Sequence, residues 1–316
     1  MSTIAQPRPQ VASVSLTASD TDPQAFASEL GESFERYGFA IIADHGIPAD
    51  LIGRAEDKAR AFFALPDDVK RKYHIAGGGG ARGYTPFGIE TAKGATAYDL
   101  KEFWHVGREL PPGHPYEALM APNVWPEEVR SFRDTFLELF AAFDATGLRI
   151  LEAIARYLGL ADDYFVDTVK DGNSVLRLLH YPPIPGDGPN VRAGAHEDIN
   201  TITLLLGAEE AGLQLLDRDG NWLPVTPNEG ELAVNIGDML QRLTNAVLRS
   251  TTHRVVNPPP ERRGKSRYSM PFFLHFRPDF MIEALPGCVG EDRPRKWAPI
   301  SAHDYLLERL REIKLT

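Results

Sequence analysis

Two residues that bind transition metals, His196 and Asp198, are separated in the sequence only by Glu197. Successive side chains of a β-strand alternate between its two faces, and each residue advances the chain by about 3.3 Å. In a strand, His196 and Asp198 therefore point the same way and can reach one metal ion, whereas Glu197 faces away. The segment 199–206 is rich in β-branched and aliphatic residues, which favours a strand as the setting.

A third ligand has to come from elsewhere in the chain, and His253 is the candidate. The run 252–256 around it again contains β-branched residues and is followed by prolines, which end strand pairing. Two histidines and one carboxylate form the facial ligand set of non-haem Fe(II) oxygenases, which leaves coordination positions open for substrate and dioxygen. The same ligand types serve zinc hydrolases, so these residues alone decide neither the metal nor the reaction.

A second pair with a spacing of two, Arg267 and Ser269, begins fourteen positions after His253. In a strand, the guanidinium group and the hydroxyl group of this pair share a face. A guanidinium fork beside a hydroxyl is suited to a carboxylate. The pair therefore indicates a binding site for an organic acid.

With these residues the chain resembles the isopenicillin N synthase-like family of 2-oxoglutarate and Fe(II)-dependent oxygenases. The resemblance rests on His196-x-Asp198, on His253 within His-Arg-Val, and on Arg267-x-Ser269. It extends over most of the chain, through Tyr37-Gly38-Phe39, Asp44-His45-Gly46-Ile47, Phe62-Phe63-Ala64-Leu65-Pro66, Asn235-Ile236-Gly237-Asp238-Met239-Leu240-Gln241 and Leu243-Thr244-Asn245.

The resemblance implies a mainly β protein with flanking helices, whose core is a double-stranded β-helix, or jelly roll. It implies Fe(II), 2-oxoglutarate as cosubstrate and O2, and a reaction that couples decarboxylation of 2-oxoglutarate to hydroxylation or desaturation of a small molecule. The iron ligands, which are also the catalytic residues, would be His196, Asp198 and His253. The far carboxylate of 2-oxoglutarate would meet Arg267, Ser269 and Tyr181.

Two other functions stay open at this point. Some family members are Fe(II) oxidases that use no 2-oxoglutarate and give the Arg-x-Ser pair to a substrate carboxylate. A non-catalytic metal-binding module on the same fold is the other alternative, although the intact ligand set argues against it. In addition, Leu179 stands where many members carry Asn, so one hydrogen bond on the cosubstrate side is expected to be absent.

In the family, the region around Arg82 and Tyr84 lies near the substrate pocket. Both residues are therefore candidate substrate contacts, and so is Phe103. A solvated arginine and a tyrosine in the core are the alternative interpretations. The sequence does not reveal the primary substrate.

Composition narrows the choice of partners. The formal net charge of −10 gives no electrostatic reason to expect nucleic acid or an anionic membrane as a partner, so a small-molecule substrate fits better. The single cysteine, Cys288, excludes an internal disulfide framework and favours the cytoplasm. Residues 1–10 contain no apolar core of signal-peptide length, and nowhere do about eighteen apolar residues run together. The oligomeric state is not determined.

Helices are expected where apolar residues recur every three or four positions. One should run over 23–37, with Asp22 as N-cap, Pro23 at the first position and Gly38 as the stop. Others are expected over 48–65, over 125–158 as one long helix or two abutting ones, and over 301–315.

Beyond residue 172 the pattern changes to short β-like runs broken by Gly, Pro, Asn and Asp. This spacing is typical of a β-sandwich or barrel, and the absence of alternating helices argues against a doubly wound sheet. We expect one structural unit with an N-terminal region over 1–115, a long helical segment over 116–171, the metal-bearing jelly roll over 172–280 and a C-terminal helical extension over 281–316.

Overall fold

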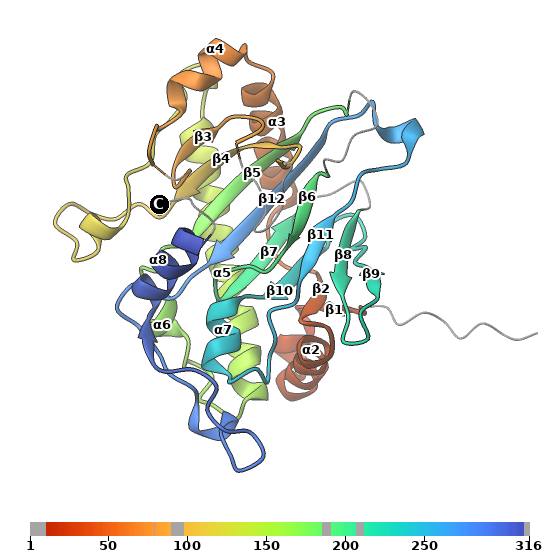
Figure 1. The fold of residues 1–316 in the computed structure, drawn as a ribbon, viewed down its shortest axis with the longest axis vertical. Helices are drawn as coiled ribbons and strands as arrows, with labels where there is room; N and C mark the ends of the chain where they lie inside the picture. Colours follow the sequence, from red (N-terminus) through yellow and green to blue (C-terminus); the bar gives the residue numbers. More distant parts are fainter. Residues whose placement is uncertain (1–10, 79, 90–97, 185–190, 207–211, 313–316) are drawn as a thin grey trace, which may run out of the picture.

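The computed structural model describes residues 11–78, 80–89, 98–184, 191–206 and 212–312 (Figure 1). The expected absence of a signal peptide in residues 1–10 and the last three residues of the helix expected over 301–315 lie outside the described residues. The larger of two facing sheets has eight strands. In spatial order these are Ser13–Ser15 (β1), Phe39–Ala43 (β2), Leu232–Ile236 (β10), Ile202–Leu206 (β7), Arg267–Leu274 (β12), Val175–Tyr181 (β5), Glu102–Gly107 (β4) and Gly83–Thr85 (β3).

The smaller sheet has four antiparallel strands, Ala193–His196 (β6), His253–Val255 (β11), Leu213–Leu216 (β8) and Trp222–Pro224 (β9). Its apolar residues, among them Leu215 and Val255, form one buried cluster with Phe39, Ile41 and Ala233 of the larger sheet. The two sheets therefore enclose a core between them, which confirms the predicted jelly roll. A short two-stranded sheet joins Met281–Ile282 (β13) to Ile300–Ser301 (β14).

Helices cover the other face of the larger sheet (Figure 1). The α-helices are Ala18–Thr21 (α1), Pro23–Tyr37 (α2), Ala49–Phe63 (α3), Asp67–Lys70 (α4), Phe132–Tyr157 (α5), Val166–Val169 (α6), Asp238–Leu243 (α7) and Ala302–Glu312 (α8). Short 3-10 turns lie at Arg71–Tyr73, Glu117–Leu119, Pro260–Arg262 and Pro286–Cys288. No helix in the described ranges is long and apolar enough to cross a membrane.

Helix α2 begins and ends as its sequence predicts. The Asp22 carboxylate accepts a hydrogen bond of 3.0 Å from the backbone N–H of Ala25, which satisfies one of the amides that the first turn leaves unpaired. Gly38 ends the helix with φ of 69°, a left-handed conformation that glycine adopts without steric cost.

Helix α5 begins later than predicted, at Phe132 rather than near Trp125. Ser131, immediately before it, has φ of 59°, which interrupts any helix entering from the N-terminal side. The apolar face of α5 packs on the sheet, where Phe143 lies parallel to Phe272 of β12 at a centroid distance of 5.3 Å.

Strands from distant segments share one sheet. β2, from the expected N-terminal region, pairs with β10, and β4 pairs with β5, so both flank strands of the expected jelly-roll core. β3, β4 and α7 were not predicted. All six residues of β4 are buried, including Glu102 and His105, and such a strand lacks the alternation of polar and apolar residues that identifies a half-exposed one.

Candidate metal centre

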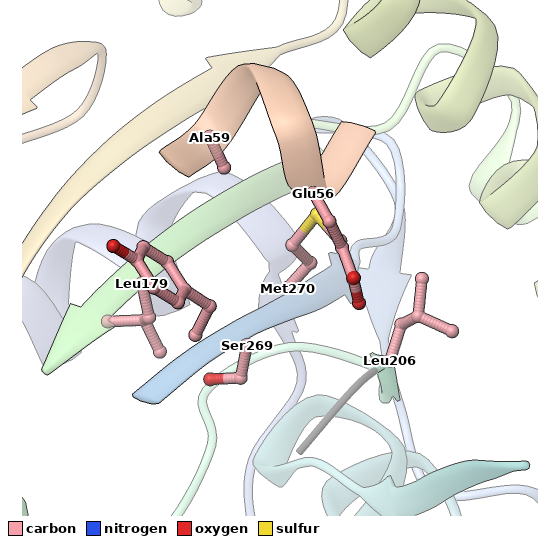
Figure 2. A pocket seen from close by; sticks show the side chains of 7 residues that line it. Glu56, Ala59, Leu179, Leu206, Ser269 and Met270 are labelled. Atoms are coloured by element: carbon pink, nitrogen blue, oxygen red, sulfur yellow. The ribbon is translucent and has the colours of Figure 1, made fainter. Parts of the chain in front are cut away.

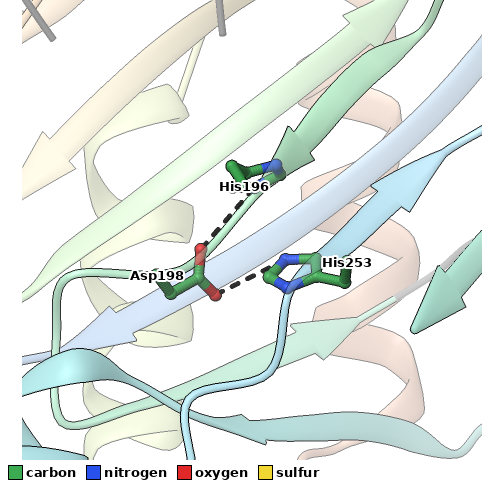
Figure 3. Close-up of side chains that lie close together, drawn as sticks. All are labelled: His196, Asp198 and His253. Atoms are coloured by element: carbon green, nitrogen blue, oxygen red, sulfur yellow. Dashed lines mark ion pairs between the residues drawn. The ribbon is translucent and has the colours of Figure 1, made fainter. Parts of the chain in front are cut away.

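The two sheets bring together three side chains from separate places in the sequence. His196 ends β6, His253 begins β11 opposite it, and Asp198 lies to one side of the two rings, with one carboxylate oxygen toward each (Figure 3). The Nε2 atom of His196 lies 3.7 Å from one Asp198 oxygen, and the Nε2 atom of His253 lies 3.8 Å from the other. Ligand atoms from all three lie within 4.8 Å of one another, so they can contact one ion.

The local setting of Asp198 differs from the prediction. Strand β6 ends at His196, and Asp198 lies in the loop that leads to β7, so the two residues do not share a strand. Their convergence therefore comes from the loop rather than from strand alternation. Glu197 does point away, because its exposed carboxylate accepts a hydrogen bond from the Thr252 hydroxyl.

Backbone carbonyls orient both imidazole rings. The Nδ1 atom of His196 lies 2.8 Å from the Gly194 carbonyl oxygen, and that of His253 lies 3.0 Å from the Thr251 carbonyl oxygen. A carbonyl only accepts, so each Nδ1 carries a proton, and in the neutral ring it is Nε2 that keeps the lone pair. Both lone pairs are thus available on the side of Asp198.

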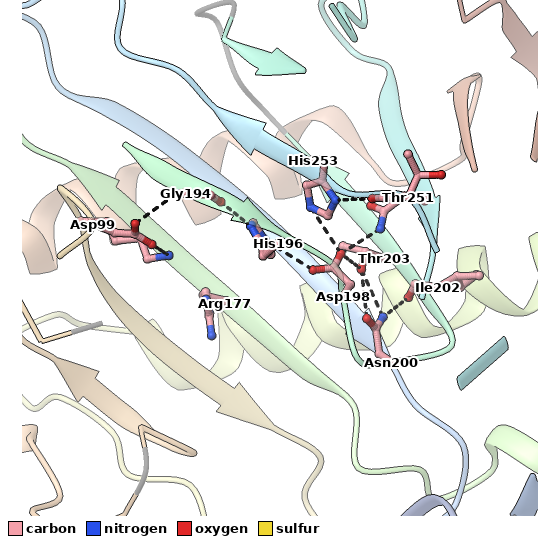
Figure 4. A network of polar contacts seen from close by, with 12 residues as sticks. Asp99, Arg177, Gly194, His196, Asp198, Asn200, Ile202, Thr203, Thr251 and His253 are labelled. Carbon is pink, nitrogen blue, oxygen red and sulfur yellow. Dashed lines mark hydrogen bonds and ion pairs between the residues drawn. The ribbon is translucent and has the colours of Figure 1, made fainter. Parts of the chain in front are cut away.

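Two donors fix the Asp198 carboxylate (Figure 4). The Thr203 hydroxyl on β7 and the Asn235 amide on β10 both donate to its Oδ2 atom, at 2.6 and 2.8 Å. The backbone N–H of Asp238, at the start of α7, donates to the Asp198 carbonyl oxygen at 2.7 Å. The larger sheet and α7 therefore hold the carboxylate and its loop in place.

Electrostatics favour the protonation states that bind a metal. The pKa of His196 lies below its usual value, first because of burial and then because of the nearby His253 and Lys101. Burial by itself would raise the pKa of Asp198, but the two histidines and the Asn235 and Thr203 hydrogen bonds outweigh it and lower the pKa. At neutral pH Asp198 is thus ionised and His196 neutral, as metal ligation requires.

The predicted cosubstrate residues lie together on neighbouring strands. Arg267 on β12 pairs with Tyr181 on β5, and its guanidinium carbon lies 5.1 Å from the centre of the Tyr181 ring. Ser269 pairs with Leu179, which packs with Phe103 and Tyr181 in an apolar cluster. Arg267 and Ser269 are both buried. Leu179, which stands where many family members carry Asn, places an apolar side chain beside Ser269.

A small cavity, with room for little more than one water molecule, lies between α3 and the ends of β5, β7 and β12 (Figure 2). Glu56 and Ala59 of α3 line it together with Ser269 and Met270 of β12. None of the three metal-ligand candidates borders this cavity, so it is distinct from the metal centre.

The candidate substrate contacts are divided between the two faces of the sheet. Tyr84 lies on the helix-covered face, where its ring packs against Phe62 and its hydroxyl donates to Glu102. It therefore does not face the metal ligands, and its position fits the core alternative. Phe103 lies on the opposite face of the sheet, where it packs with Leu179. Arg82 is only 4% exposed, which contradicts the alternative interpretation that it is a solvated arginine.

Sequence reasoning gave no role to Thr203, Asn235 or Arg177. Arg177, Leu179 and Tyr181 occupy alternate positions of β5, so a strand assignment could have placed Arg177 on the same face as Tyr181. No local signal marks Thr203 and Asn235 as partners of Asp198, because they come from different strands that only the folded sheet brings together.

The residues present fit a catalytic transition metal. Two imidazole nitrogens and one oriented carboxylate approach one another closely enough to hold one ion, and this is the set that holds non-haem Fe(II). Partners fix each ligand in turn, as metal sites require.

Comparisons with known proteins agree with this geometry. Residues 10–128 match the profile of the non-haem dioxygenase N-terminal region, described for morphine synthesis, and residues 172–276 match that of the 2OG-Fe(II) oxygenase superfamily. The 2-oxoglutarate-Fe(II) type oxidoreductase hxnY of Emericella nidulans is 36% identical over 88% of this chain and 82% of its own length. The proline hydroxylase buaE of Petromyces alliaceus is 32% identical over 91% of this chain and 93% of its own length.

Solved structures of similar fold come from the same group of oxygenases. A Caulobacter crescentus protein assigned to the 2OG-Fe(II) oxygenase family is 58% identical, with a TM-score of 0.91 over 96% of this chain and 99% of that one. A full-length Neurospora crassa protein, solved with α-ketoglutarate, which is 2-oxoglutarate, is 31% identical, with a TM-score of 0.85 over 95% of each chain. The chain belongs to the 2OG-Fe(II) oxygenase superfamily, and it is an enzyme of the class that uses Fe(II), 2-oxoglutarate and O2.

Proposed function

We propose that His196, Asp198 and His253 hold the catalytic Fe(II), and that the enzyme hydroxylates or desaturates a small organic molecule beside it. The observation that carries this proposal is the convergence of the two Nε2 atoms and the carboxylate within 4.8 Å. Because all three ligands come from one side, the remaining coordination positions stay open to 2-oxoglutarate and dioxygen.

We assign the far carboxylate of 2-oxoglutarate to Arg267 and Ser269, with Tyr181 beside them. The guanidinium and the hydroxyl lie on one face of β12, both buried, so an ion pair formed there is shielded from water.

With iron bound, the site supplies oxidative chemistry that amino acid side chains lack. The protein's own contribution is to orient three ligands, to anchor the cosubstrate at the far end and to exclude water between the sheets. Thr203 and Asn235 keep the Asp198 carboxylate in one orientation, and the carbonyls of Gly194 and Thr251 keep both histidines in the tautomer that leaves Nε2 available.

Relatives support a small-molecule substrate and the use of 2-oxoglutarate. The Neurospora crassa protein has been solved with both α-ketoglutarate and thymine, and buaE is named a proline hydroxylase. Thymine and proline are both small ring compounds with aliphatic carbons. We also infer a cytoplasmic location, because one cysteine cannot form an internal disulfide.

An anaerobic titration tests the proposal. The Fe(II)-loaded protein is titrated with 2-oxoglutarate, and we expect the visible absorption band of a 2-oxo acid chelated to Fe(II). Succinate, which lacks the keto group, serves as the control and should give no band. If no band forms and the protein still oxidises a substrate, the enzyme is a cosubstrate-independent oxidase instead.

A further inference from the structure

A buried histidine at the end of β12, His275, takes no part in the metal centre. Its neighbours Leu274 and Phe276 belong to the apolar cluster under the helices. Leu274 faces α5, where an added Cβ on Gly147 would come within 2.5 Å of the Leu274 Cδ1 atom. Because side chains alternate along a strand, His275 points to the opposite face of the larger sheet, the inner face.

Strand pairing places His275 close to the metal ligands. Phe273, two residues before it on the same face, lies opposite Thr203 of β7 in the antiparallel register. The Thr203 hydroxyl donates to the carboxylate of Asp198, one of the three ligand candidates. Residues two apart on a strand are separated by about 6.6 Å, so His275 lies one side-chain position beyond the residue that faces Thr203. A small molecule bound beside the metal can therefore reach it.

Solvent reaches the inner face in this region. Phe273 is only partly buried, whereas Phe272 and Leu274, which face the helices, are completely buried. The side chain of His196 at the metal centre is 37% exposed. His275 itself is 7% exposed, so it borders the accessible region without lying on the outer surface.

The His275 ring is held in the same tautomer as both histidines of the metal centre. Its Nδ1 lies 3.0 Å from the carbonyl oxygen of Phe273, two residues before it, and His196 and His253 make the equivalent bond. A carbonyl only accepts, so this Nδ1 carries a proton. Burial lowers the pKa of His275 to about 4, so at neutral pH the ring is neutral and its Nε2 keeps a lone pair.

That lone pair has no protein donor within the described part of the chain. There, the bond to Phe273 is the one hydrogen bond of the ring, and His275 does not belong to the cluster that can share an ion. A buried acceptor that lacks a donor is unfavourable, and a donor on a bound molecule would compensate it.

The backbone around His275 is fixed before any molecule binds. The His275 N–H donates to the Ser174 hydroxyl oxygen at 3.2 Å. Gly172 packs so closely on the carbonyl oxygen of His275 that an added Cβ would come within 2.1 Å of it. The position of the acceptor is therefore set by the fold.

We propose that His275 binds the primary substrate by accepting, at Nε2, a hydrogen bond from an O–H or N–H group of that substrate, whose apolar part packs on the ring of Phe273. A ring nitrogen that only accepts selects a donor and disfavours a carboxylate, which also only accepts. The substrate is thus a small molecule that presents a hydroxyl or an N–H group at this end. This inference rests on the proposed function, because it places the substrate beside the Fe(II) site.

The test compares donors with their methylated counterparts. Benzyl alcohol and benzyl methyl ether form the O–H pair, whereas 2-piperidone with 1-methyl-2-piperidone and uracil with 1,3-dimethyluracil form the N–H pairs. Binding to the anaerobic Fe(II) protein, saturated with 2-oxoglutarate, is measured by calorimetry and by the change in the visible band. We expect at least one donor to bind ten or more times more tightly than its counterpart, because a site built to pair with a donor rejects the analogue that lacks it.

Variants at His275 identify the acceptor. His275→Phe keeps a flat ring without the acceptor and should reduce the preference to less than threefold; if it does not fold, His275→Leu takes its place. His275→Gln, whose side-chain oxygen can occupy the position of Nε2, should keep a preference above threefold. His303→Phe changes a histidine of α8, on the helix side of the larger sheet, and should keep the wild-type preference. Unfolding temperatures and the 2-oxoglutarate band show whether fold and cosubstrate site are retained.

The outcomes separate this inference from the proposed function. If 2-oxoglutarate gives its band but no donor binds more tightly than its methylated counterpart, the role of His275 is overturned and the oxygenase function stands. A folded His275→Phe or His275→Leu that keeps a tenfold preference overturns it as well. If neither metal nor 2-oxoglutarate binds, both proposals fall.

Discussion

The Thr203 hydroxyl gives the sharpest test of how the fold supports the metal centre. Thr203 is 3% exposed, and its hydroxyl donates to Asp198 Oδ2 at 2.6 Å while also contacting the side chain of Asn200. Thr203→Val keeps the shape of the side chain and removes the donor. A hydrogen bond to a charged acceptor contributes about 1.5 to 3 kcal/mol.

The expected loss in metal affinity follows from this value. Asn235 still donates to the same oxygen at 2.8 Å, so the carboxylate keeps one of its two donors. We therefore expect the dissociation constant for Fe(II) to rise by about 10- to 100-fold, the range found when an outer partner of a metal ligand is removed. That range corresponds to about 1.4 to 2.7 kcal/mol and agrees with the loss of one such bond.

The measurement is an anaerobic competition between the protein and a chromophoric chelator for Fe(II). Thr203→Ser, which keeps the hydroxyl, is the matched control and should bind within about threefold of the wild type. Denaturant unfolding of the metal-free proteins separates a general loss of stability from a specific loss of affinity. If folded Thr203→Val binds Fe(II) as tightly as the wild type does, the hydroxyl does not orient the ligand and our reasoning about Asp198 fails.

Four further predictions address the site and the fold. His253→Ala should lose Fe(II) at concentrations that saturate the wild type and should release no succinate; retained turnover would show that the ligand assignment is wrong. Arg267→Leu should weaken 2-oxoglutarate binding by about 2 to 5 kcal/mol, because one partner of a buried charged pair is removed, and an unchanged dissociation constant would favour the oxidase alternative. Burial raises the pKa of Asp238 from 3.8 to about 6, so between these two pH values the folded state keeps a proton that the unfolded state has lost. The free energy of unfolding therefore falls by up to about 3 kcal/mol as the pH rises from below the unfolded pKa to above the folded one. Asp238→Asn should remove this decrease in urea unfolding between pH 4 and 7, and a slope equal to that of the wild type would contradict it. Phe272→Ala removes a fully buried ring that stacks on Phe143, and it should lower the free energy of unfolding by about 3 to 5 kcal/mol. Phe272→Leu, which leaves a smaller cavity, should cost less than half of that.

The C-terminal helix contacts the metal loop through α7. Asp238 donates its backbone N–H to the Asp198 carbonyl, and its carboxylate meets the Tyr305 hydroxyl at 3.3 Å and the Arg309 guanidinium at 3.4 Å, both from α8. The expected C-terminal extension therefore packs against the element that supports a metal ligand. This connection has no signal in the sequence, because Tyr305 and Arg309 lie more than sixty positions after Asp238.

Local sequence determined the features that depend on neighbouring residues. Helices α2, α3 and α5 follow from apolar residues repeated at a helical period, and Asp22 and Gly38 mark the ends of α2 because capping involves groups only a few positions apart. The alternation in β12 likewise placed Arg267 and Ser269 on one face. Residue types and spacing also identified the candidate ligands, since few side chains bind iron.

Tertiary structure decided what depends on contacts between distant segments. β4 and its buried Glu102 could not be recognised locally, because that carboxylate is compensated by Lys70 and His180 from other elements. Tyr84 lies on the helix-covered face of the larger sheet, and Arg177 lies on the face toward the metal ligands. Strand pairing decides this, because it fixes which side of a sheet each residue occupies. Asp198 reaches the two histidines from a loop, held by Thr203 of β7 and Asn235 of β10, and only the pairing of these two strands, which are distant in the sequence, brings those donors together.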